Sequence, residues 1–308
     1  MPEVKRLFSV GSCNNSVIMA QPRTPESAGG KARPFAVEQA RGQLRHLSSQ
    51  ISRAIKSSNP AAVHDLRVAI RRFTQAIAVT DMRKNRRRLK KIMTLAGEVR
   101  NCDVALKFIA RFKVPHAAVL QSKLEGRRKE SEGALVAELI KWRDRRLSLK
   151  WRTALDSTPS SDKDVDELAR RVLGRIAKDF QKRGNEASSP EATPKYLHHF
   201  RIAAKKFRYA LELFQPLYGS SLDPLIASIK SASTLLGDIN DCVTVAGIIA
   251  GYKGGNRLAD RLKKRQHKKT EEFRKYWKEE FTRSSIDPLS KKPVASSRIV
   301  SDRRKSAA

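Results

Sequence analysis

The first regular pattern along the chain is a run of apolar residues spaced alternately three and four positions apart, from Val37 to Ala54. This spacing places apolar side chains on one face of a helix. Asn59-Pro60 interrupts the run and suits the start of a second helix, because proline is tolerated in the first helical turn. Similar patterns continue to Phe281, and none alternates with the period of two that is typical of strands. We therefore predict an all-α fold.

Composition divides the chain at both ends and near its middle. The N-terminal residues are rich in Ser, Pro, Gly and Asn, and the C-terminal residues are rich in Ser, Lys and Arg. We expect both ends to be disordered, since they lack an apolar pattern. The segment DSTPSSDK has the composition of a linker. The predicted boundaries are 1–33 for the leader, 34–155 for a first helical unit, 156–163 for the linker, 164–283 for a second unit and 284–308 for the basic tail.

Three glycines are expected to interrupt helices. Gly97 precedes Asn101 by four positions, and Gly237 precedes Asp241 in the same way. Glycine often ends a helix, and Asn or Asp often caps the next one. We predict a helix boundary at both places, with ion pairs to nearby arginines as a second role for the capping positions. A further break is expected near Gly133.

One segment of the chain occurs twice. Val63–Arg72 reads VHDLRVAIRR and Leu197–Lys206 reads LHHFRIAAKK, with the same spacing of one histidine and three basic residues. Steps of three and seven place side chains on one face of a helix, opposite its apolar face. A solvated surface explains one such helix, but repetition in the same register favours a shared ligand. The first basic stripe comprises His64, Arg67, Arg71 and Arg72, and the second comprises His198, Arg201, Lys205 and Lys206.

A second pair of motifs follows the stripes in the same order. Residues 95–103 read LAGEVRNCD and residues 235–243 read LLGDINDCV. Two matching motifs in one order indicate an internal duplication, with a longer loop in the second copy around YGSSLDP. Cys102 and Cys242 coincide in this alignment and are predicted to be small buried residues. The tryptophans at 142, 151 and 277 are predicted to anchor the packing.

The charge of the chain indicates its class of ligand. Its 64 Lys and Arg face 31 Asp and Glu, for a net charge of +33. Such an excess favours an acidic partner: nucleic acid, an anionic membrane or polyphosphate. Aromatic residues make up 6% of the chain, which is low for a protein that stacks single-stranded bases. The sequence has no apolar run of membrane-span length and no secretory core, so we expect a cytoplasmic location.

Two other stretches are dense in basic residues, Arg83–Lys91 and Arg261–Lys269. They either form a solvated surface or contribute to the same binding surface as the stripes, and the sequence leaves both open. The further residues that would contribute are Arg87, Lys90, Lys91, Arg100, Arg261, Lys264, Arg265 and Lys268.

Signatures of enzymes are absent from the sequence. It has no Walker A, GxGxxG or HExxH motif and no acidic cluster for magnesium. Its three cysteines lack CxxC spacing, so neither a disulfide framework nor a zinc site is expected. The residues HDLR at 64–67 match the H-box of sensor histidine kinases by coincidence, because no glycine-rich ATP-binding half accompanies them. We predict no catalysis, no cofactor and no metal.

The two motif pairs together resemble the CHAD domain, the conserved histidine α-helical domain. The resemblance is carried by VHDLRVAIRRF, LHHFRIAAKKFRYALELF, LAGEVRNCDV and LLGDINDCV, and extends over about Phe35–Phe281. It implies two antiparallel helical bundles, related by pseudo-twofold symmetry around a basic central cavity that binds inorganic polyphosphate. It also implies that Arg208 and Tyr209 join the two stripes as ligands. Thr74 and Asn101 depart from the pattern, because Arg and Asp are expected there.

We therefore expect a stand-alone cytoplasmic protein that binds inorganic polyphosphate and associates with polyphosphate granules. The alternative is a nucleic-acid-binding protein that uses the same basic helices as an open surface. Stripes from both halves that face inward favour a thin polyanion, whereas a flat outer face favours DNA or RNA.

Overall fold

Helices make up nearly all of the chain that the structure describes, which confirms the all-α prediction. The computed structural model describes residues 31–80, 82, 86–112, 117–158, 164–250, 252 and 255–281. Over these residues, β-structure is limited to one isolated bridge between Lys31 and Asp164. The helices are α1 (Ala32–Lys56), α2 (Pro60–Ile77), α3 (Arg87–Phe112), α4 (Ala118–Asp144), α5 (Leu147–Asp156), α6 (Val165–Ser188), α7 (Pro194–Tyr218), the 3-10 helix η1 (Gly219–Leu222), α8 (Asp223–Ile249) and α9 (Gly255–Glu280).

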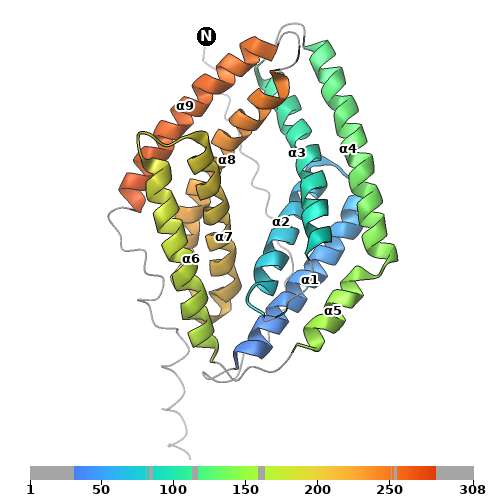
Figure 1. Cartoon of the computed structure of the whole chain (residues 1–308), viewed down its shortest axis with the longest axis vertical. Helices are drawn as coiled ribbons and strands as arrows, with labels where there is room; N and C mark the ends of the chain where they lie inside the picture. Colours follow the sequence, from blue (N-terminus) through green and yellow to red (C-terminus); the bar gives the residue numbers. More distant parts are fainter. Residues whose placement is uncertain are drawn as a thin grey trace, which may run out of the picture.

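Consecutive helices pack in pairs, and the pairs form two groups. α1 packs with α2, α3 with α4, α6 with α7 and α8 with α9. Figure 1 shows α1–α5 on one side of the molecule and α6–α9 on the other. The two groups meet where α1 contacts α6, α2 contacts α7 and α3 contacts α8. The two helices that carry the basic stripes therefore lie against each other.

A continuous apolar core joins the two groups of helices. Phe35 of α1 stacks on Phe214 of α7, with ring centroids 5.7 Å apart. Burying one such side chain contributes about 1.5–3 kcal/mol of stability. The apolar faces of α2 and α7 are buried as predicted, which fixes the rotation of both helices and turns their basic faces away from the core. The buried residues of these two faces are Leu66, Ala69, Ile70, Phe73 and Ile77 in α2, and Phe200, Ala203, Ala204, Phe207 and Leu211 in α7.

The predicted packing anchors and cysteines are also buried. Trp142, Trp151 and Trp277 are each at most 4% exposed, and Cys102 and Cys242 are 1% exposed. Burial raises the pKa of the Cys242 thiol to about 11. Both described cysteines therefore act as small apolar residues.

The predicted helix breaks at the three glycines are wrong. α3 runs without interruption through Gly97 and Asn101, α8 through Gly237 and Asp241, and α4 through Gly133. A glycine inside a helix costs roughly 0.5–1 kcal/mol relative to alanine, and the packing of these long helices outweighs that cost. At Gly97 the site itself supplies a different reason for glycine.

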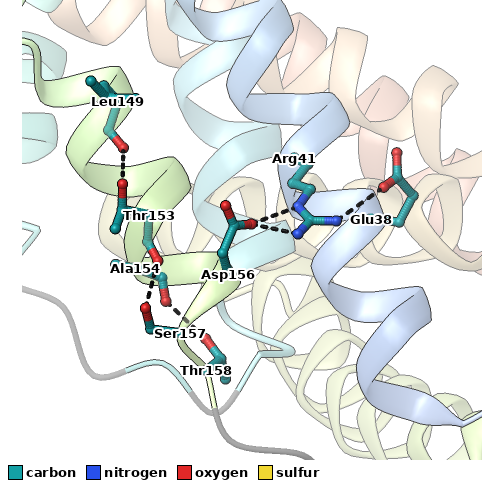
Figure 2. A network of polar contacts seen from close by, with 8 residues as sticks. All are labelled: Glu38, Arg41, Leu149, Thr153, Ala154, Asp156, Ser157 and Thr158. Carbon is teal, nitrogen blue, oxygen red and sulfur yellow. Dashed lines mark hydrogen bonds and ion pairs between the residues drawn. The ribbon is translucent and has the colours of Figure 1, made fainter.

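The start of the predicted linker is tied to α1 at the end of α5. Figure 2 shows Asp156 accepting a hydrogen bond from Arg41, with Nε and Oδ1 2.9 Å apart. Ser157 and Thr158 donate their hydroxyl protons to the carbonyl oxygens of residues 153 and 154, at 3.0 and 3.1 Å. The hydroxyl of Thr158 thus serves the carbonyl of Ala154 at the end of α5, whereas the carbonyl of Thr153 also accepts the backbone N–H of Ser157 at 3.0 Å.

The predictions for the two ends of the chain remain predictions. The tail 284–308 and residues 1–30 of the leader lie outside the described residues, as do residues 159–163 of the linker. The described part of the leader already enters α1, which begins at Ala32.

One described stretch, Pro194–Ile249, is long and apolar enough to cross a membrane if length and composition alone are considered. It comprises α7, η1 and α8, and these helices contribute Phe200, Phe207 and Leu236 to the core. Core helices of soluble proteins meet the same criterion, so this stretch gives no clear indication of a membrane span.

Candidate polyanion-binding site

The sequence places the two histidines at matching depths in their helices. α2 and α7 both begin at a proline, Pro60 and Pro194, four positions before the histidine of their stripe. Asn59 caps α2 by accepting a hydrogen bond from the backbone N–H of residue 62 at 2.9 Å. Because the apolar faces are buried, the equivalent first residues of α2 and α7 place the two stripes at the same distance from the start of each helix. His64, His198 and Lys206 are exposed, whereas Arg67, Arg71, Arg72, Arg201 and Lys205 are partly buried.

The two stripes act on each other electrostatically. Burial, followed by the charges of Arg71 and Arg201, lowers the pKa of Arg67 to about 10. Burial, followed by Arg201 and Arg71, lowers the pKa of Lys205 to about 6. The pKa of His64 is lowered first by burial and then by the guanidinium of Arg100. Cations from α2, α3 and α7 therefore converge, and we call His64, Arg67, Arg71, Arg100, Arg201 and Lys205 the basic cluster.

One carboxylate lies within reach of the basic cluster from α8. The charge of Asp241 acts on Arg67, Arg201 and Lys205. Burial raises the pKa of Asp241, while Arg201 and Arg100 oppose that rise. Asp65 also acts on His64, but two carboxylates cannot neutralise the four arginines of the cluster, which keeps an excess of positive charge. Asp241 lies inside α8, so its predicted role as a helix cap is wrong, and its charge acts on the cations of the cluster instead.

Gly97 allows the guanidinium of Arg67 to lie across α3. Arg67 Nη1 donates a hydrogen bond to the carbonyl oxygen of Met93 at 3.2 Å. A Cβ at position 97 would lie 2.8 Å from the same Nη1, closer than van der Waals contact permits. At the matching Gly237, nothing lies within 4 Å of such a Cβ. Glycine at position 97 therefore leaves room for the guanidinium of Arg67 in this position.

Two predicted ligands share a carboxylate that the sequence analysis missed. Glu212 accepts hydrogen bonds from Arg72 Nε at 3.1 Å and from Arg208 Nη1 at 2.7 Å. Arg208 also lies over the ring of Tyr209, 4.5 Å from its centroid, and Tyr209 is 5% exposed. The four-residue spacing of Arg208 and Glu212 was a signal for their pairing, but nothing in the sequence indicated the contact with α2.

His198 lies beside α8 rather than within the basic cluster. Its Nδ1 is hydrogen-bonded to Asn240 Oδ1 at 2.9 Å, which requires the proton on Nδ1 because an amide oxygen only accepts. The two residues line a pocket of about 320 Å³ together with Lys195 and Thr244. The equivalent pair in the first half is His64 and Arg100, so a cation there replaces the amide.

The further predicted residues on α3, namely Arg87, Lys90, Lys91 and Arg100, face different directions. Arg100 joins the basic cluster through its effect on His64. Lys91 instead forms an ion pair with the buried Glu138 of α4 at 2.9 Å. Arg87 and Lys91 line a pocket of about 450 Å³ between α3, α4 and α5. Lys90 is exposed.

The basic run of α9 is engaged mainly with its neighbours. Arg261 Nη1 donates to the carbonyl oxygen of Phe112 at 2.8 Å, and Arg265 pairs with Asp238 of α8 at 3.0 Å. Lys264 and Lys268 are exposed. The hydrogen bonds and ion pairs of this run among the described residues join it to α3, to α8 and to its own helix.

The described residues contain no group of three or more His, Cys, Asp and Glu that could hold a metal ion. Independently of this, the convergence of Lys, Arg and His in the basic cluster suits the binding of an anion.

Comparisons with known proteins agree with this architecture. The chain is similar in structure to the CHAD domain from the plant Ricinus communis, with a TM-score of 0.72 and 21% identity, over 81% of this chain and 92% of that one. It is also similar to PptA from Streptomyces chartreusis, with a TM-score of 0.61 and 14% identity, over 81% of this chain and 100% of that one. At these identities the likeness shows the fold alone.

The family comparison covers most of the region that carries the stripes. No curated protein matches the chain. The family model of the CHAD domain matches residues 38–250, which is more than half of the chain and includes both motif pairs. The chain therefore belongs to the CHAD domain family.

Proposed function

We propose that this protein binds inorganic polyphosphate through the basic cluster. The observation that carries the proposal is the convergence of partly buried cations from both stripes on one carboxylate, Asp241. Keeping like charges together away from water is unfavourable, and an anionic ligand would relieve that cost. The association of the CHAD family with polyphosphate supports the same ligand.

The site is proposed to lie in a basic central cavity between two duplicated, pseudo-symmetric halves. The contacts between the groups join helices at equivalent places in each half: α1 with α6, α2 with α7 and α3 with α8. Equivalent positions also interact within each half: Arg100 acts electrostatically on His64, and His198 is hydrogen-bonded to Asn240. A twofold relation between the halves would explain both observations.

The proposed ligands differ in how directly they can reach a phosphate. The basic cluster forms the centre of the site. Arg201 Nε is buried and has no hydrogen-bond partner among the described residues, so it can donate to a bound oxygen. His198 and Lys206 are exposed beside the cluster. Arg72, Arg208 and Tyr209 form one end, where Glu212 competes for the two arginines.

A thin polyanion fits this arrangement better than a duplex does. Polyphosphate carries a negative charge on every phosphate group, and its narrow chain can approach side chains that lie between four helices. A duplex would meet only the exposed outer cations. Nucleic-acid binding through an open basic surface remains the second candidate function, favoured by the exposed Lys264 and Lys268 of α9.

We propose that the protein acts by binding and not by catalysis. The family match covers a CHAD domain, and no catalytic domain is identified with it. Binding would be driven by charge-assisted hydrogen bonds and by release of counterions. A cytoplasmic location at polyphosphate granules would follow from such binding.

A competition experiment tests this proposal. Long-chain polyphosphate, duplex DNA and RNA are compared at matched phosphate concentration and fixed, near-physiological salt. We expect polyphosphate to displace both nucleic acids, and its affinity to fall steeply as salt rises. Equal or tighter binding of DNA would favour the second candidate function and exclude the first.

A further inference from the structure

Glu212 joins cations from both halves of the protein. It lies on α7, and its two carboxylate oxygens accept from different partners: Oε2 from Arg72 of α2, and Oε1 from Arg208 of α7. The ion pair with Arg72 Nη2 measures 3.0 Å, so Arg72 binds Oε2 through two nitrogens. A carboxylate that accepts a charge-assisted hydrogen bond from each of two arginines holds both guanidinium groups in place.

The geometry places this carboxylate in line with the second stripe. Glu212 follows Lys205 by seven positions, which is two helical turns on the same face of α7. Its side chain is 20% exposed and that of Arg208 is 18% exposed, so water screens the pair only in part. The guanidinium of Arg208 also lies over the ring of Tyr209. Glu212 therefore offsets one of the two positive charges at this end of the stripe in the free protein.

The first half of the protein has no equivalent carboxylate. By the offset of the two stripes, position 212 corresponds to Ala78, which is the C-cap of α2. In the alignment of the two halves, α7 extends beyond the position at which α2 ends, and Glu212 lies in this additional part of α7. The acid at the centre of the cluster, Asp241, acts on Arg201, Arg100 and Lys205 and not on this end. Glu212 is thus one of the features that distinguish the two halves.

We propose that Glu212 ends the polyphosphate site at Arg71 and Lys205, by occupying Arg72 and Arg208 with a carboxylate that belongs to the protein. This inference rests on the proposed function. A phosphate chain that extends past Lys205 must displace an intramolecular partner, which is always present at high effective concentration. Glu212 therefore acts as a positioning residue that limits both the length of the site and its affinity.

The test compares two variants that each remove one negative charge. Glu212→Gln frees Arg72 and Arg208, whereas Asp179→Asn frees Arg183 from a comparable pair on α6, which includes none of the proposed ligands. We expect Glu212→Gln to bind long-chain polyphosphate about five- to thirtyfold more tightly than the wild type, because two cations become available. The dependence of the affinity on salt should also become steeper, since more counterions are released. Asp179→Asn should change the affinity by less than about twofold.

Ligand length and a mutant cycle separate this role from a general effect of charge. Tripolyphosphate is short enough to bind at the centre of the cluster, so we expect its affinity to change by less than about twofold in Glu212→Gln. The gain for long chains should disappear when Arg72 and Arg208 are both replaced by glutamine. Glu212→Ala, which removes the carboxylate by truncation, should show the same gain and serves as a second variant if Glu212→Gln does not fold.

The inference is overturned if long chains gain no affinity in either variant, if tripolyphosphate gains as much, or if the gain persists without the two arginines. The proposed function fails in a different way, because then the wild-type protein would not bind polyphosphate at all.

Discussion

Lys205 gives the proposed site a dependence on pH. Burial and the charges of Arg201 and Arg71 lower its pKa from an ordinary 10.5 to about 6. At pH 7 about one tenth of the free protein should carry a charged Lys205. A phosphate chain beside Lys205 supplies negative charge that favours the ammonium form, so its pKa should rise on binding. We predict that binding is coupled to the uptake of a proton.

The size of the effect follows from this shift. If binding raises the pKa of Lys205 to about 8 or higher, the protein should take up roughly 0.8–0.9 protons per site at pH 7. The affinity should then fall by up to about tenfold per pH unit between pH 6 and the pKa of the bound state.

The lowered pKa of Lys205 also determines how the free energy of unfolding changes with pH. The folded protein binds fewer protons than the unfolded chain between about pH 6 and 10.5, so Lys205 makes stability rise with pH across this window.

Calorimetric titration in two buffers with different ionisation enthalpies measures the proton uptake. Long-chain polyphosphate is the appropriate ligand, because its terminal groups contribute few protons. Lys205→Met should abolish the uptake at pH 8. His64→Gln should leave most of it, because the pKa of His64 starts below its ordinary value of 6.5. Absence of uptake in the wild type, or full uptake in Lys205→Met, would refute the reasoning.

Two further predictions concern the glycines and the core. Gly97→Ala should displace Arg67 from Met93 and lower polyphosphate affinity by about 1 kcal/mol in a binding assay. The matched Gly237→Ala should leave affinity unchanged and stabilise its helix by about 0.5–1 kcal/mol in a thermal melt. Equal affinities for the two variants would contradict the role of Gly97. Phe73→Ala or Phe207→Ala should each lower the free energy of unfolding by roughly 3–5 kcal/mol, because both side chains are fully buried. A loss below about 1 kcal/mol in denaturant melts would contradict their place in the core.

The amphipathic pattern predicted the fold and the direction of the stripes well. Apolar residues at helical spacing decided which face of α2 and α7 is buried, so His64 and His198 had to lie on the opposite side. Helix continuity was harder to predict. Gly97 matches the local signal for a helix end, but the reason for glycine at this position is a guanidinium that belongs to another helix.

Contacts between the two halves were the least predictable part of the site. Glu212 and Arg208 have a spacing that indicates a pair within one helix, and this pair is present. The bond from Arg72 to the same carboxylate depends on how α2 crosses α7, which no local pattern encodes. The same holds for Arg100 and Asp241, whose importance follows from the packing of α3 against α8.

The central claim is that both stripes bind one polyanion, and paired charge removal tests it most directly. Arg67→Gln combined with Arg201→Gln removes one cation from each stripe, and Arg175→Gln combined with Lys178→Gln removes two exposed cations of α6 as a matched control. Calorimetric titration with long-chain polyphosphate at fixed salt should show a loss of about 1–3 kcal/mol per site for the stripe pair. The control pair should lose less than about 0.5 kcal/mol in total, and circular dichroism should show intact helices in both proteins. An unchanged affinity in a stripe variant that unfolds more easily, or equal losses in the two pairs, would contradict the claim.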